Sequence, residues 1–111
     1  RQAKQLDRAA EVTKQAIKLL PGDSDLRFDL GVIYRVQQKT AEAIAAYREA
    51  IKINEKNADA WYDLGVLLAQ DRQKQEAVDA FNKYIDLVGD KKPVQAEGVR
   101  QQIKSIGGTP H

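Results

Sequence analysis

The chain has 111 residues, enough for one domain with a modest hydrophobic core. Its 18 basic and 16 acidic side chains give a formal charge of +2, and no basic block or tail is present to follow a phosphate backbone, so nucleic acid is not an expected partner. The absence of cysteine excludes disulfides, thiol chemistry and thiolate metal sites, and it suits the cytoplasm and the periplasm equally.

Neither direct membrane insertion nor a secretion signal is predicted. The longest apolar stretch, residues 64–69, is far shorter than the roughly 20 residues that span a bilayer. Residues 1–4 are polar and lead into a charged amphipathic segment, which is not typical of a signal peptide. Because the chain contains no methionine, at its start or elsewhere, we expect a soluble fragment of a longer protein.

The chain repeats itself with a period of 34 residues. The sequence Asp-Leu-Gly-Val at residues 29–32 returns without mismatch at residues 63–66. The matches fall on one face of each segment, as a shared packing surface requires. Further identical pairs are Asp25 and Asp59, Glu42 and Glu76, Ala43 and Ala77, Ala46 and Ala80, and Ile51 and Ile85.

Each repeat is predicted to form two helices, because its apolar residues recur at helical spacing. We expect helices over residues 24–38, 40–54, 58–72 and 74–88. Ser24 and Asn57 stand where the first helix of each repeat needs an N-cap, and Thr40 is the expected N-cap of the second helix of the first repeat.

Two glycines lie inside predicted helices at equivalent positions, Gly31 and Gly65. Glycine in a helix interior costs about 1 kcal/mol relative to alanine. Since the cost occurs in both repeats, we expect a close helix–helix approach that a Cβ would block. The small residues Ala43 and Ala77 are the expected facing surface.

These residues resemble the tetratricopeptide repeat (TPR) family, whose pattern is W-x2-L-G-x2-Y, then A-x3-F, then P, on a 34-residue period. The second repeat carries Trp61-x2-Leu64-Gly65, followed by Ala77-x3-Phe81. The first carries Leu30-Gly31-x2-Tyr34, then Ala43-x3-Tyr47 and Ala50. The departures are mild: Arg27 replaces the tryptophan, Leu68 the tyrosine, Tyr84 a small residue, and Glu55 and Gly89 the closing proline.

The resemblance implies an all-α fold, a right-handed superhelical array of antiparallel helix pairs, or α-solenoid. We expect a single domain, residues 1–111. It would comprise the second helix of a truncated repeat (1–23), two full repeats (24–57 and 58–91), a C-terminal capping helix (92–106) and a loose tail (107–111). Pro21 then falls at the closing proline of the truncated repeat, and Pro93 opens the capping helix at a favoured position.

No catalytic constellation is apparent, so we predict no enzymatic activity, no cofactor and no metal. A hydrolytic triad needs a nucleophile beside a general base. The single histidine, His111, is the last residue, where order is not expected. Ser24 is explained as a cap and Ser105 as a solvent residue, and Asp23 and Asp25 are acidic residues that a helix start favours.

In the resembled family, the first helices line a concave groove that takes a segment of a partner protein. The resemblance implies a protein–protein interaction scaffold that binds an apolar peptide segment or an amphipathic helix. An apolar arc on an exposed surface usually marks such an interaction site. The groove positions carried over to this sequence are Asp25, Phe28, Val32, Arg35, Val36, Asp59, Tyr62, Val66, Ala69 and Gln70.

Co-chaperone members of the family clamp a C-terminal carboxylate with groove lysines and asparagines. The matching positions here hold Phe28, Val32, Tyr62 and Val66, so binding of a chaperone tail is not expected. The aromatic residues of the repeat pattern are expected in the core rather than in the groove: Tyr34, Tyr47, Trp61 and Phe81.

Two alternatives stay open. The groove could be filled within the chain by the helix over residues 93–106 or by a neighbouring segment. The chain could also be a self-assembly element that dimerises or stacks end to end. In the second case Ala9, Ala10, Ile17 and Leu20 would lie on an exposed end of the array, without the helix that would cover them.

Overall fold

The computed structural model describes residues 2–111, and Arg1, the first residue of the predicted segment 1–23, lies outside the described part. Within residues 2–111 there are six α-helices and no strand, which confirms the all-α prediction. None of these helices is both long and apolar enough to cross a bilayer. The helices are α1 (Gln2–Leu19), α2 (Ser24–Val36), α3 (Thr40–Ile53), α4 (Ala58–Gln70), α5 (Lys74–Val88) and α6 (Pro93–Ser105).

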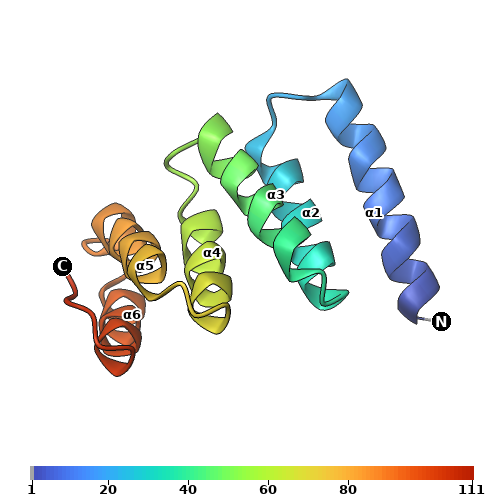
Figure 1. The fold of residues 1–111 in the computed structure, drawn as a ribbon. Helices are drawn as coiled ribbons and strands as arrows, with labels where there is room; N and C mark the ends of the chain where they lie inside the picture. The colour runs from blue at the N-terminus through green and yellow to red at the C-terminus, as the bar shows by residue number, and fades with distance from the viewer. Residues whose placement is uncertain (1) are drawn as a thin grey trace. The chain divides into compact units, whose positions relative to one another are not determined.

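The helices form two compact units, residues 1–57 and 58–111. In the first unit α2 contacts both α1 and α3, and in the second α5 contacts both α4 and α6 (Figure 1). The pairs α2–α3 and α4–α5 correspond to the two predicted repeats, and their ends lie within two residues of the predicted ranges.

Both helix pairs turn in the same way. Gln38 (φ 63°) and Arg72 (φ 61°), which are 34 residues apart, adopt the left-handed conformation just after the first helix of each pair. The N–H of Lys39, the residue after Gln38, donates a hydrogen bond to the carbonyl of Tyr34 at 2.8 Å. The equivalent hydrogen bond in the second unit is 2.9 Å long. This is the helix-ending motif in which a residue in the left-handed conformation allows two carbonyls of the last helical turn to accept hydrogen bonds.

The N-cap prediction for Ser24 is wrong. Asp23 is the N-cap of α2, and its carboxylate accepts a hydrogen bond from the N–H of Leu26 at 3.1 Å. Ser24 is already helical and buried, and its hydroxyl donates to the carbonyl of Ala50 at 2.7 Å. The Asn57 side-chain amide donates to the same hydroxyl at 2.9 Å. Ser24 therefore joins the start of α2 to the end of α3.

The cap predicted for α3 is also displaced. Lys39 occupies the N-cap position and makes no side-chain capping bond, whereas Thr40 is the first helical residue and is exposed. The tight turn explains why the N-cap position falls on Lys39 rather than on Thr40. The helix begins directly after the residue that follows left-handed Gln38. An N-cap needs a short side-chain oxygen at that position, which lysine lacks.

The helix glycines mark a close approach, as predicted, but the facing group is different. A Cβ on Gly31 would lie 2.6 Å from the ring of Tyr47, and one on Gly65 would lie 2.7 Å from the ring of Phe81. Tyr47 is fully buried. The predicted facing residues, Ala43 and Ala77, are also buried, but they lie one turn before the rings that occupy the space.

Of the other aromatic residues predicted to lie in the core, only one is buried. Phe81 is buried as predicted, whereas Tyr34 and Trp61 are half-buried. Trp61 packs against the core of the second unit, and the Lys83 Nζ lies 6.0 Å from its ring centroid. The buried members of that core are Val78, Phe81, Tyr84, Ile85, Val88, Val99 and Ile103.

The expectation of a loose tail over residues 107–111 is wrong. The segment folds back on α5, where the buried side chain of Asn82 donates to the Thr109 carbonyl at 3.1 Å and accepts from the His111 N–H at 2.7 Å. A buried amide strongly favours hydrogen-bonding partners, and this segment supplies them.

Enlarging either helix glycine is expected to destabilise the protein. Gly31→Leu and Gly65→Leu place a side chain against a buried ring that cannot move aside, and overpacking of this kind costs roughly 1–3 kcal/mol or more. Chemical denaturation followed by circular dichroism measures the change in unfolding free energy.

Gly98→Ala is the matched control. Gly98 is exposed in the middle of α6, and a Cβ there would meet nothing within 4 Å. Alanine should therefore stabilise α6 by up to about 1 kcal/mol. Equal stability of the Gly31→Leu variant and the unaltered chain would contradict the close contact.

Candidate functional site

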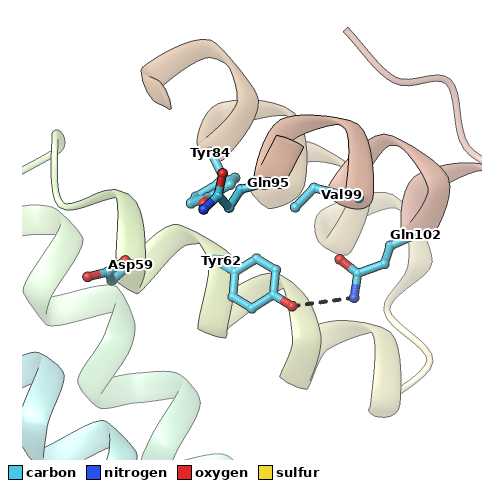
Figure 2. Close-up of a pocket in the computed structure, with 7 residues that line it drawn as sticks. Asp59, Tyr62, Tyr84, Gln95, Val99 and Gln102 are labelled. Carbon is cyan, nitrogen blue, oxygen red and sulfur yellow. Dashed lines mark hydrogen bonds between the residues drawn. The ribbon is translucent and has the colours of Figure 1, made fainter. Parts of the chain in front are cut away.

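The second unit holds an open cleft of about 530 Å³ between α4 and α6, with α5 at its base. Figure 2 shows the Tyr62 ring projecting from α4 toward α6, with its hydroxyl directed at Gln102. The lining combines aromatic and apolar surface with side-chain amides, and a single carboxylate. The lining residues are Asp59, Tyr62, Tyr84, Gln95, Gly98, Val99 and Gln102.

Aromatic contacts hold Tyr62 in place. Its ring lies 5.9 Å from the Phe81 ring and 5.4 Å from the Tyr84 ring, measured between centroids, and both pairs are tilted. Tilted pairs at this distance are favourable beyond the area that they bury. The Gln102 side-chain amide donates to the Tyr62 hydroxyl at 3.5 Å, which is long for a hydrogen bond. Packing therefore orients Tyr62 more strongly than the hydrogen bond does.

The cleft holds one carboxylate, that of Asp59, and its other polar groups are tyrosine hydroxyls and glutamine amides. Burial raises the pKa of the Tyr84 hydroxyl, and the nearby Asp59 carboxylate and Tyr62 add to the shift. The neutral form of Tyr84 is favoured because a phenolate there would be poorly solvated and next to a negative charge. Asp59 itself is exposed at the mouth of the cleft. The cleft thus combines apolar surface with one exposed carboxylate.

The predicted groove residues of α4 do not all meet in this cleft. Asp59 and Tyr62 line it, while Val66 is half-buried and packs against the core of the second unit. Ala69 is half-buried and Gln70 is exposed at the end of α4, and neither lines the cleft. A charge at Val66 would therefore cost folding stability, since part of that side chain is core.

In the first unit the equivalent arc has a different surrounding. Phe28 is half-buried over the Tyr47 ring, 5.7 Å between centroids, and Val32 is half-buried. Asp25 and Arg35 are exposed. Val36 is exposed and borders a smaller hollow of about 390 Å³ between α1 and α2, which is also lined by Gln2, Ala3, Leu6, Asp7, Gln37 and Lys39.

Acidic side chains also gather at the start of α2. Partial burial raises the pKa of the Asp29 carboxyl, and the neighbouring Asp25 and Asp23 carboxylates raise it further. Among residues 2–111, no three histidine, cysteine or acidic side chains are placed to hold a metal ion together.

The sequence pattern does not predict that Tyr84 and Val99 line a cleft. It identifies Tyr84 only as a departure from the small residue of the family pattern, and it places Val99 in the capping helix over residues 92–106. The signal for α6 is the open alternative that the helix over residues 93–106 lies at the groove. Gly98 carried no signal, since an exposed helix glycine has no packing partner.

Helix pairs with a recurring glycine–ring contact and a 34-residue period define a helical repeat protein. Two sequence models match the chain: a TPR repeat over residues 31–71 and a tetratricopeptide repeat over residues 58–87. Together they cover residues 31–87, just over half of the 111 residues. The chain belongs to the tetratricopeptide repeat family, as its sequence pattern predicted.

Solved structures share the fold. The Yersinia enterocolitica type III secretion chaperone SycD, in complex with a peptide of the translocator YopD, matches with a TM-score of 0.85 and 19% identity over 95% of this chain and 82% of the other. An alternative dimer of SycD matches with a TM-score of 0.84 and 20% identity, over 95% and 81%. MamA matches with a TM-score of 0.73 and 22% identity, over 91% and 60%. No curated protein matches the chain.

Changes at Tyr62 should separate packing from hydrogen bonding. Tyr62→Phe removes only the long bond to Gln102 and should change the unfolding free energy by less than about 0.5 kcal/mol. Tyr62→Ala removes both ring contacts of a half-buried side chain and should cost about 1–3 kcal/mol. Thermal or urea unfolding measures both. A large loss in Tyr62→Phe would show that the hydroxyl, not the ring, orients this side chain.

Proposed function

We propose that the chain is a non-enzymatic scaffold that binds an apolar segment or an amphipathic helix of a partner protein, with the α4–α6 cleft as its principal contact. The observation that carries the proposal is an open, aromatic cleft beside a carboxylate on the groove side of a TPR helix. The structure of SycD with a YopD peptide supports it, because a protein of the same fold takes a peptide.

The side chains that line the cleft indicate which chemical groups a ligand would present. Tyr62, Tyr84 and Val99 provide apolar surface for a side chain such as leucine or phenylalanine, while Asp59 stands exposed at the edge. A carboxylate beside an apolar site favours a lysine or arginine next to the apolar anchor, since the pair forms without burying an unpaired charge. We therefore propose an apolar anchor followed or preceded by a basic residue.

The groove positions of the first unit extend this proposal. Phe28, Val32 and Val36 offer apolar surface on α2, and Asp25 adds a carboxylate at an equivalent position to Asp59. We propose that these positions of the first unit take apolar side chains of a partner protein in their own right.

Self-assembly is the second candidate function, and α1 favours it. Three apolar side chains on or next to this helix are strongly exposed: Val12 (59%), Leu19 (81%) and Leu20 (57%). The existence of a SycD dimer shows that a protein of this fold can pair. A concentration series in sedimentation velocity distinguishes the candidates, because self-assembly requires the sedimentation coefficient to rise with concentration.

Filling the cleft should abolish ligand binding without harm to the fold. Gly98 lines the cleft and has free space around it, so Gly98→Leu adds a side chain in the cleft and also removes a helix glycine. A peptide selected from a random display library against the unaltered chain should bind this variant at least about tenfold more weakly, a loss of about 1.4 kcal/mol. The fluorescence of Trp61, the single tryptophan, or polarisation of a labelled peptide reports binding.

Gln101→Leu provides the matched control. Gln101 is exposed on the same helix and does not line the cleft, so a leucine there should leave affinity unchanged. Equal binding to the Gly98→Leu variant and the unaltered chain would place the ligand on another face. Melting curves of both variants show whether the fold is retained.

A further inference from the structure

A polar side chain interrupts the apolar face of α5 at Asn82. It is 6% exposed and lies one helical turn from Val78 on one side and from Asp86 on the other. Both functional groups of its amide are used by one short segment: the nitrogen donates to the Thr109 carbonyl at 3.1 Å, and the oxygen accepts from the His111 N–H at 2.7 Å. Asn82 therefore binds the backbone of an extended peptide rather than a particular side chain.

The end of α6 directs the segment to this place. Gly107 has φ +84°, and its N–H bonds to the Lys104 carbonyl at 2.9 Å. The Gly108 N–H bonds to the Ile103 carbonyl, also at 2.9 Å. These two bonds with a left-handed glycine form a Schellman motif, which ends the helix and reverses the chain toward α5.

Two residues of the segment, Gly108 and Pro110, suit its position against α5. A Cβ on Gly108 would collide with Val78 and would lie 3.0 Å from the Ile103 Cγ2, so only glycine fits there. Pro110 stands between the two residues that bond to Asn82, and proline has no N–H that would need a partner. Its ring also fixes the backbone angle φ, which reduces the entropy lost when the segment binds.

The last residue is held from two helices. The His111 Nδ1 lies 2.8 Å from the Asp86 Oδ1, and this contact is an ion pair only when the imidazole is protonated. The His111 carbonyl accepts a hydrogen bond from the Arg100 Nε at 3.0 Å. Asp86 on α5 and Arg100 on α6 thus complete a site whose polar groups match a Gly-Thr-Pro-His segment at successive positions.

We propose that Val78, Asn82, Asp86, Arg100 and Ile103 form a second peptide-binding site, separate from the cleft. It takes an extended Gly-X-Pro-His segment of a partner protein, and residues 108–111 occupy it in cis. If residues 108–111 served only to cover apolar surface on α5, an apolar residue at position 82 would be sufficient. Asparagine there leaves two unmet hydrogen bonds whenever the segment departs, so it favours replacement by another peptide backbone.

The cis segment is suited to exchange. The Thr109 and His111 side chains are exposed, so the segment buries little side-chain surface of its own. Its attachment is a short turn at Gly107, and its advantage over a partner segment is the high effective concentration that the covalent link provides. A partner segment that adds contacts beyond these four residues can overcome that advantage.

The test uses the full chain with its cis segment displaced. In Gly108→Val the added side chain collides with Val78 and Ile103, so residues 108–111 should leave the site. A fluorescent Gly-Gly-Thr-Pro-His peptide, blocked at both ends, should bind this variant at least about tenfold more tightly than it binds the unaltered chain. Adding Asn82→Leu to Gly108→Val should abolish binding, as should valine in place of the second glycine of the peptide. Failure of the peptide to bind a folded Gly108→Val variant overturns the proposal.

A second measurement stands if Gly108→Val fails to fold. In the unaltered chain the His111 N–H should exchange slowly with deuterium, and Asn82→Leu should accelerate that exchange at least about tenfold, because the acceptor is gone. Equal exchange in the two proteins overturns the proposal. If the unaltered chain dimerises and the peptide dissociates the dimer, the occupant is a second copy of the chain, and the partner assignment is overturned.

Discussion

The contact between a helix glycine and an aromatic ring is the constraint on which both units depend. Gly31 receives the Tyr47 ring and Gly65 receives the Phe81 ring, each at a distance that no Cβ would allow. The same rings then support the groove residues, because Phe28 lies 5.7 Å from Tyr47 and Tyr62 lies 5.9 Å from Phe81. Core packing and the candidate binding surface therefore share one structural element.

The two units show how one repeat pattern produces two different surfaces. Where the second unit has Tyr84, the first has Ala50, 34 residues earlier. Tyr84 forms the base of the cleft, whereas the Ala50 carbonyl receives the Ser24 hydroxyl and no ring is present. A departure from the small residue of the family pattern thus adds an aromatic ring to the site in the second unit, and α6 contributes Gly98, Val99 and Gln102 to its lining.

The segment after α6 illustrates a different use of polar groups. Asn82 is buried on an apolar helix face, where an unpaired amide would be costly, and its partners come from residues 27 and 29 positions away in the chain. Such a group selects one backbone register, while apolar contacts alone would tolerate several. The order of residues 107–111 is therefore a property of α5 and α6 as much as of the segment itself.

The sequence by itself determined the helical class, the repeat period, the helix positions and the close approach at the two glycines, because these follow from local periodicity and from residues that repeat. It did not determine the caps at Asp23 and Lys39, which depend on how the tight turns enter the helices. Only the tertiary structure decided that rings rather than alanines face the glycines, that Val66 packs against the core, and that Tyr84 and Gly98 join Tyr62 in a cleft. These outcomes depend on side-chain reach across neighbouring helices, which a pattern along one helix does not contain.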